Sequence, residues 1–161
     1  MSRALQLATA AAAAAAVVVL GVSLRRRLHH HDPERIVRAY YDAWASGDPD
    51  AVRQLVADDY RGHVHAVAGT EDRGADDLGE LVESHAEAFD EVEYVVEDVL
   101  RDDGRVAARV TMRAHHRETG RDGEIGGLVV LRLEGERVAE EWSSWDYLGL
   151  ARQLGLAGAE G

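Results

Sequence analysis

An aspartate near the C-terminus lies among aromatic residues that favour proton chemistry. Residues 140–155 read EEWSSWDYLGLARQLG, with Asp146 directly after Trp145. Apolar surroundings raise the pKa of a carboxyl group, and such an aspartate can remove a proton next to a carbonyl group and return it. Asp146 also precedes an apolar helical pattern, where it would serve as the N-cap. The sequence leaves both roles open, acid/base catalyst and helix cap.

Strand alternation groups Asp146 with the other tryptophan of this stretch. Residues 137–144 follow a strand pattern, and Trp142 shares the parity of Asp146 whereas Trp145 does not. Side chains two positions apart on a strand project to the same face. We therefore expect Trp142 to lie beside Asp146 and to contact the ligand.

Three histidines are candidates for the polar lining of a pocket around Asp146. His63 and His65 would point to one side of a strand, and His116 continues the apolar face of residues 105–116. We predict that His116 or His63 polarises a carbonyl group and that His65 lines the pocket. The alternatives are a structural role for His116 and a plain surface position for the other two. No third ligand has a spacing typical of a metal site, so we expect no metal.

The first predicted helix carries an aromatic stripe. Tyr40, Tyr41 and Trp44 recur at helical spacing. Most of this aromatic area is expected in the core. Tyr41 and Trp44 are also candidates for a pocket wall and for substrate binding, which a ligand with flat rings would favour.

The elements that would position these residues fall into a helical half and a strand half. Asp32-Pro33 suits a helix start, and Gly47-Asp48-Pro49 ends that helix and begins a second. The apolar period then changes from about four to two, which predicts an α+β fold with helices on one face of an antiparallel sheet. Gly126-Gly127 lies within a strand pattern and indicates a bulge or bend. The remaining expected elements are a short strand or loop at 60–67, a helix at 74–89, and strands at 91–100, 105–116, 124–134 and 137–144.

Two longer motifs resemble a known family. The order of elements, with IVRAYYDAWASGDPDAVRQLVADDY at its start, resembles the nuclear transport factor 2-like superfamily. The ending ERVAEEWSSWDYLGLARQLG resembles the SnoaL-like polyketide cyclase (ester cyclase) family. The resemblance covers about residues 33–156. The segment MRAHHRETGRDGEIGG is shorter than the corresponding segment of many members, which leaves the substrate class open.

This resemblance implies a fold, an assembly and a chemistry. The implied fold is cone-shaped, with three N-terminal helices packed on a curved antiparallel sheet and a pocket between the sheet and the long helix. Members are usually homodimers and use neither a metal nor an organic cofactor. A pocket aspartate acts as acid/base for an intramolecular aldol closure in members of the family, and Asp146 matches its motif position.

The N-terminal segment is expected to anchor the chain in a membrane. Residues 4–24 carry no charge and are long enough to cross a bilayer, and Arg25, Arg26 and Arg27 follow them. The positive-inside rule then predicts a single-pass protein in the cell membrane with its body in the cytoplasm. The alternatives are a cleaved signal peptide, with an exported body, and a misassigned start codon, with a soluble cytoplasmic body. We therefore expect an anchor and basic linker at 1–31 and a SnoaL-like domain at 32–161.

Composition excludes several classes of function. The chain has no cysteine, which excludes disulfides and thiolate chemistry. Its net charge is -12, all 30 acidic residues follow residue 31, and every basic residue is arginine. The segment after residue 31 is acidic enough to repel nucleic acid, so we do not expect nucleic acid as a partner. Lysine-free acidity is typical of halophilic proteins, and GC-rich coding is the alternative explanation.

Two hypotheses for function follow. The first is a cofactor-free cyclase or isomerase in which Asp146 is the acid/base and the substrate is a small apolar carbonyl compound. The second is a non-catalytic, membrane-anchored module that binds an apolar ligand or dimerises. Covalent acyl chemistry is not expected, because the chain has no G-x-S-x-G motif.

Overall fold

The fold begins with two helices that each have a proline in the first turn. In the computed structural model, which describes residues 32–66 and 68–157, α2 is Pro33–Ser46 and α3 is Pro49–Leu55. Gly47 takes a positive φ of 68° between them. The side chain of Asp48 caps α3 by accepting a hydrogen bond from the backbone N–H of Asp50. Both predicted helices are confirmed.

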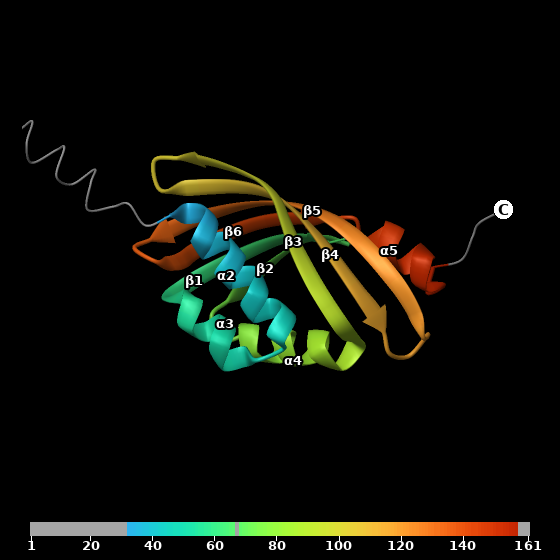
Figure 1. Ribbon diagram of the computed structural model, residues 1–161. Helices are drawn as coiled ribbons and strands as arrows, with labels where there is room; N and C mark the ends of the chain where they lie inside the picture. The colour runs from blue at the N-terminus through green and yellow to red at the C-terminus, as the bar shows by residue number, and fades with distance from the viewer. Residues whose placement is uncertain (1–31, 67, 158–161) are drawn as a thin grey trace, which may run out of the picture. The chain divides into compact units, whose positions relative to one another are not determined.

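A six-stranded curved sheet packs against these helices, in the order β2-β1-β6-β5-β4-β3 (Figure 1). The last four strands form the expected antiparallel meander. A third helix, α4 (Leu78–Ala88), connects β2 to β3. The strands are β1 Val56–Ala66, β2 Gly69–Gly74, β3 Phe89–Asp102, β4 Arg105–His116, β5 Arg121–Glu134 and β6 Arg137–Trp145.

The sheet departs from the expected, fully antiparallel one at β1. This strand pairs antiparallel with β2 but parallel with β6. No tight turn fixes the direction of β1 against β6, because residues 67–136 lie between them. Sequence reasoning also missed β2, whose residues GTEDRG are largely exposed and show no apolar alternation. The helix expected from residue 74 begins at Leu78, because the N–H of Gly74 donates to the side chain of Asp77 in a turn that precedes the helix.

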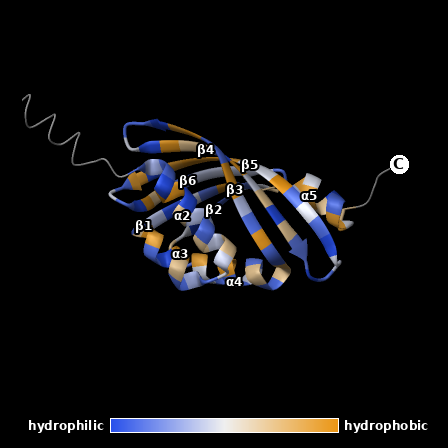
Figure 2. Ribbon diagram, viewed as in Figure 1, coloured by the Kyte–Doolittle hydropathy of each residue, from blue (hydrophilic) through white to orange (hydrophobic). Residues whose placement is uncertain are grey.

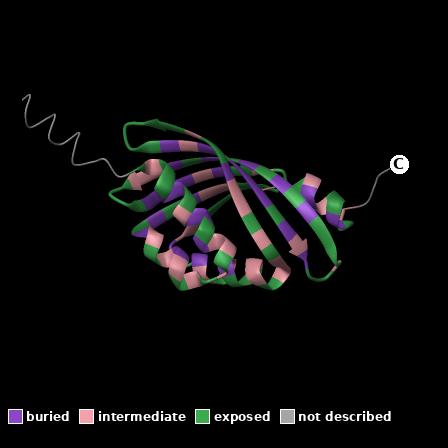
Figure 3. Cartoon of the chain, in the orientation of Figure 1, coloured by how far each residue is buried: buried purple, intermediate pink, exposed green. Residues whose placement is uncertain are grey.

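The sheet has a buried inner face and an exposed outer face. Alternate positions along β4 and β5 are buried (Figure 3), and these are largely the hydrophobic positions (Figure 2). On β4 the predicted apolar face is confirmed as buried, with His116 as its last residue. The inner face holds two clusters of apolar residues, and the rings of Tyr94 and Trp145 pack against both.

Gly127 makes room for Trp145 on the inner face. These two residues pair across β5 and β6, and a Cβ added to Gly127 would lie 2.4 Å from the indole ring. A bulge or a bend was predicted at Gly126-Gly127; the pairing of β4 with β5 is continuous through both residues, so there is no bulge between these strands. The irregularity between β5 and β6 lies instead between Arg132 and Leu133.

The described chain ends with α5, Tyr147–Leu154, which lies beside β5 (Figure 1). Leu150 and Leu154 pack on Met112 and Ile125, so α5 covers one end of the inner face. Within residues 32–66 and 68–157, no helix has the length and apolar character needed to cross a membrane. The expected membrane segment, residues 4–24, lies outside the described residues.

Candidate functional site

A buried carboxyl group lies at the centre of the inner face. Glu141 of β6 is 8% exposed, and its Oε2 accepts hydrogen bonds from Tyr40 (2.8 Å) and Tyr60 (3.1 Å). Tyr40 comes from α2 and Tyr60 from β1, so three elements meet at one oxygen atom. We call these three residues the interior network. It joins the helical layer to the sheet through polar groups at a position that apolar side chains usually fill.

Burial governs the protonation of the interior network. It raises the pKa of Glu141 above the ordinary value of 4.5, and the hydrogen bonds from Tyr40, Tyr60 and Ser143 oppose that shift. Burial also raises the pKa of Tyr40, with a further contribution from Glu141. Neutral tyrosine hydroxyl groups therefore surround a carboxyl group that holds its proton more tightly than an exposed glutamate does.

A glycine allows Tyr60 to reach the carboxyl group. Gly62 follows Tyr60 by two positions on β1, and a Cβ added there would lie 2.7 Å from the Tyr60 hydroxyl oxygen. Any other residue at this position would push the phenol away from Glu141. The glycine thus helps position the interior network.

Three aromatic rings form a wall next to the interior network. The ring centroid of Tyr41 lies 5.1 Å from that of Tyr94 and 6.2 Å from that of Trp145, and Tyr94 and Trp145 are also 6.2 Å apart. We call these residues the aromatic wall. The hydroxyl group of Tyr41 is buried and has no hydrogen-bond partner among the described residues.

A histidine holds the far side of the aromatic wall. His85 of α4 contacts the Tyr94 hydroxyl at 3.2 Å through Nε2, and burial lowers the pKa of its imidazole. The predicted wall residue Trp44 packs edge-on against the same imidazole. Tyr94 therefore differs from Tyr41, because its hydroxyl already has a partner.

Asp146 follows β6 and caps α5. Its Oδ1 accepts a hydrogen bond from the backbone N–H of Gly149 at 2.9 Å, and its side chain is exposed. A Cβ at Gly149 would lie 2.1 Å from the Asp146 carboxylate, so the glycine makes room for this cap. Asp146 follows Trp145 directly, which places the carboxylate next to a wall residue in the chain. The capping role that the sequence left open is the one seen in the structure.

The structure does not bring His116 to Asp146. The imidazole of His116 accepts a hydrogen bond from the backbone N–H of Thr119 at the β4–β5 turn and packs on Phe89. His116 pairs with Arg121, while the backbone N–H of Asp146 donates to Gly126, five residues further along β5. These positions are about 16 Å apart at the usual strand rise.

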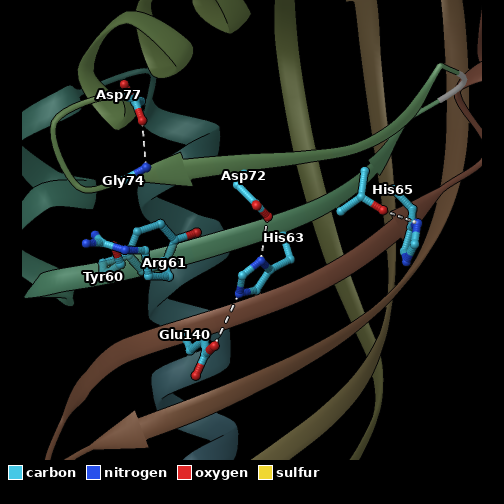
Figure 4. Close-up of polar contacts among 9 residues, drawn as sticks. Tyr60, Arg61, His63, His65, Asp72, Gly74, Asp77 and Glu140 are labelled. Atoms are coloured by element: carbon cyan, nitrogen blue, oxygen red, sulfur yellow. Dashed lines mark hydrogen bonds and ion pairs between the residues drawn. The ribbon is translucent and has the colours of Figure 1, made fainter.

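His63, His65 and Trp142 lie away from the inner face. Figure 4 shows the His63 ring between Asp72 and Glu140. Its Nδ1 lies 2.7 Å from Asp72 and its Nε2 3.2 Å from Glu140, and the ring stacks on Trp142. The hydrogen bond with Asp72 is the main cause of the raised pKa of His63, and Glu140 adds to it. His65 contacts Thr70 in the β1–β2 hairpin (Figure 4). Trp142 alternates with Glu141 along β6 and therefore lies on the opposite face of the sheet, away from the interior network.

The irregular pairing of β5 with β6, between Arg132 and Leu133, explains why Glu141 was not predicted from the sequence. Val138 and Ala139 are both buried, so the alternation of β6 changes phase ahead of Glu141. If every second residue is counted forward from Val138, the inner face receives Glu140 and Trp142. If every second residue is counted back from Trp145, it receives Ser143 and Glu141. The sequence feature that could have predicted the inward position of Glu141 was therefore Trp145, together with Gly127, which pairs with it.

Among the described residues, no group of three or more His, Asp or Glu side chains is arranged to hold a metal ion. The titratable side chains in the interior instead contact one another. They are joined by hydrogen bonds and ring contacts rather than by a common centre.

Comparison with known proteins places this arrangement in a family. The sequence profile of the SnoaL-like polyketide cyclase family matches residues 34–154. Among curated proteins none matches the chain significantly. A solved structure, that of IdmH from Streptomyces antibioticus, a proposed polyketide cyclase, is 27% identical. It covers 78% of this chain and 99% of its own, with a TM-score of 0.68.

Two further structures share the fold at lower identity. AclR from Streptomyces galilaeus, a proposed hydroxylase, is 20% identical over 78% of this chain and 85% of its own, with a TM-score of 0.67. A protein with a ketosteroid isomerase-like fold from Catenulispora acidiphila, in complex with trimethylamine, is 20% identical over 76% of this chain and 93% of its own, with a TM-score of 0.68. The profile match spans most of the chain, and the fold agrees with it. The chain therefore belongs to the SnoaL-like polyketide cyclase family.

Proposed function

We propose that the protein is a cofactor-free cyclase or isomerase that acts on a small apolar carbonyl compound. The observation that supports this best is the interior network, in which a carboxyl group and two phenols are buried where apolar side chains would cost less free energy. Buried ionisable groups with shifted pKa values are typical of sites of acid–base chemistry. The likeness to IdmH and the trimethylamine complex of a related fold are consistent with a small ligand.

In this proposal Asp146 is the acid/base. Its carboxylate is exposed and uses one oxygen atom as the cap of α5, so the other oxygen is available to a substrate. An exposed carboxylate that removes a proton next to a carbonyl needs the carbonyl oxygen to be polarised by another group. His63 lies on the outer face, and His116 lies at the far end of β4, so the interior network is the better candidate for that group.

The test is proton exchange on a panel of apolar ketones, diketones and esters in heavy water. Nuclear magnetic resonance would follow the loss of α-hydrogen signal with wild-type protein and with Asp146→Asn. We expect exchange of at least one compound by the wild type and a large loss in the variant, with the thermal unfolding midpoint unchanged. Binding of panel compounds without any exchange would contradict the proposal.

The second candidate function is a non-catalytic module that binds an apolar ligand or dimerises. Two observations favour it: the exposed, capping position of Asp146 and an exposed apolar row on the outer face of the sheet. The row crosses the sheet from strand to strand, and each residue pairs with the next in the order Leu100 (72% exposed), Ala107, Val130 (37%), Trp142 and His63. We call these five residues the outer row. Leu128, 66% exposed, lies beside it on β5.

A homodimer that covers the outer row is compatible with either function. Exposed apolar side chains on one face of a sheet lose unfavourable contact with water when a second copy covers them. Residues 4–24 remain a proposed membrane anchor, with the body on the cytoplasmic side.

A further inference from the structure

The first part of β5 extends beyond the end of its neighbour β6. The pairing of β6 with β5 stops at Trp145, although the backbone N–H of Asp146 still donates to the carbonyl oxygen of Gly126 at 3.2 Å. Antiparallel pairing continued in the same register would bring residue 148 opposite Glu124, but residue 148 already belongs to α5. The backbone N–H and carbonyl groups of Glu124 therefore have no strand partner on this side of β5.

The side chain of Gln153 takes the place of the missing strand. Its Oε1 accepts a hydrogen bond from the backbone N–H of Glu124, and its Nε2 donates to the carbonyl oxygen of Glu124, both at 2.9 Å. A side-chain amide offers the same donor and acceptor as a peptide group, so it can bind both groups of a strand edge. The helix α5 is thus tied to one edge of β5 at both of its ends, because its N-cap residue bonds to Gly126 and its last turn bonds to Glu124.

The two residues after Gln153 fasten the same end of α5. Leu154 is buried, and a Cβ added to Gly123 of β5 would lie 3.2 Å from its side chain, so the helix packs closely on the strand. Gly155 ends the helix with a φ of 74°, a left-handed conformation that glycine adopts most readily. The QLG end of the C-terminal motif therefore attaches the last turn of α5 to β5 by two hydrogen bonds and an apolar contact.

We propose that Gln153 is a positioning residue for Asp146. The carboxylate of Asp146 accepts a hydrogen bond from the backbone N–H of Gly149 in the first turn of α5, so its orientation follows that of the helix. Without the attachment at Glu124, the only hydrogen bond from this end of the chain to the edge of β5 would be the one at Gly126, and α5 could turn about that point. The amide of Gln153 fixes the angle of the helix and, through the cap, the direction of the carboxylate. This inference rests on the proposed function, for which it names the group that holds the acid/base in place.

The first test compares the full-length variants Gln153→Met and Arg152→Met by amide hydrogen exchange. Methionine is a flexible, unbranched side chain that lacks the amide group, and Arg152 is the exposed neighbour of Gln153 in the same turn. We expect the N–H groups of Glu124 and Gly149 to exchange about fivefold to tenfold faster in Gln153→Met, the usual effect of one lost hydrogen bond. The N–H of Val110, at the centre of β4, should exchange at the wild-type rate, and Arg152→Met should change none of the three.

The second test separates positioning from stability by kinetics. It uses a carbonyl compound whose α-hydrogens the wild type exchanges in heavy water. We expect Gln153→Met to lower kcat by about tenfold and to leave KM close to that of the wild type, because a displaced acid/base slows the reacting step rather than binding. Arg152→Met should keep both constants.

Three results would overturn the positioning role: an unchanged exchange rate at Gly149 in Gln153→Met, equal acceleration at Gly149 and Val110, or an active wild type whose kcat this variant keeps. The second of these would show only a general loss of stability. A wild type that exchanges no compound would remove the proposed function. The Gly149 amide would then still decide whether Gln153 holds the cap made by Asp146.

Discussion

At the scale of single residues, two carboxyl groups have opposite environments and therefore different tasks. Glu141 is buried, accepts hydrogen bonds from two phenols and has a raised pKa. Asp146 is exposed and caps a helix. The sequence drew attention to Asp146 because of its tryptophan neighbours, but the aromatic surroundings that raise a carboxyl pKa are found at Glu141.

Glu141 should make stability depend on pH. Above pH 4.5, its ordinary pKa, the unfolded chain releases this proton while the folded chain still holds it. Stability of the wild type therefore falls, as pH rises through this window, by about 1.4 kcal/mol per pH unit relative to Glu141→Gln. Chemical denaturation of both proteins from pH 4 upward measures the difference, which also cancels the contributions of other carboxylates. A difference that stays constant with pH would show that Glu141 is ordinarily solvated.

We expect Asp146→Asn to keep the stability of the wild type and Asp146→Ala to lower it. Asn caps helices about as well as Asp, so Asp146→Asn should unfold at nearly the wild-type temperature, whereas Asp146→Ala should lose about 1 kcal/mol. Thermal unfolding of the two variants measures this. Equal stability of Ala and Asn would mean that the Gly149 hydrogen bond contributes nothing.

At the scale of elements, β6 shows what the sequence could and could not predict. The alternation of β4, the start of α2 at Pro33, the cap of α3 and the meander from β3 to β6 follow from local patterns, and all were confirmed. The parallel pairing of β1 with β6 depends on long-range contacts that leave no local period, and β2 is too polar and exposed to show one. The phase change in β6 then moved Trp142 to the outer face and Glu141 to the inner one.

The contact between β5 and Trp145 gives a direct test at this scale. Gly127→Ala would put a Cβ 2.4 Å from the Trp145 ring, whereas Gly126→Ala meets nothing within 4 Å. We expect the first variant to lose about 1–3 kcal/mol through overpacking and to disturb the aromatic wall. The second is the matched control and should stay close to wild type. Chemical denaturation with tryptophan fluorescence measures both, and equal stabilities would refute the proposed fit of Trp145 over Gly127.

At the scale of the whole molecule, the two faces of the sheet suit different partners. The inner face encloses the interior network, and the outer face presents the outer row on an otherwise acidic protein. A second copy that covers the outer row would leave the inner face of each copy available to a ligand. Assembly and ligand binding can therefore be altered separately.

Leu128→Asp should break the proposed homodimer. A charge beside the outer row would have to be buried in the interface, at a cost well above that of an exposed substitution. Sedimentation velocity at several concentrations measures the effect, and Leu156→Asp is the control because Leu156 (56% exposed) follows α5 rather than lying on the outer face. A wild-type monomer at all concentrations, or a dimer that survives Leu128→Asp, would contradict this interface.

The claim that the protein is an acid–base enzyme that uses Asp146 can be tested most directly by proton exchange in heavy water. We predict that the wild type exchanges the α-hydrogens of at least one apolar carbonyl compound, and that Asp146→Asn loses most of this exchange while it unfolds at nearly the same temperature. Equal exchange by the two proteins, or binding of a compound without any exchange, would contradict that claim.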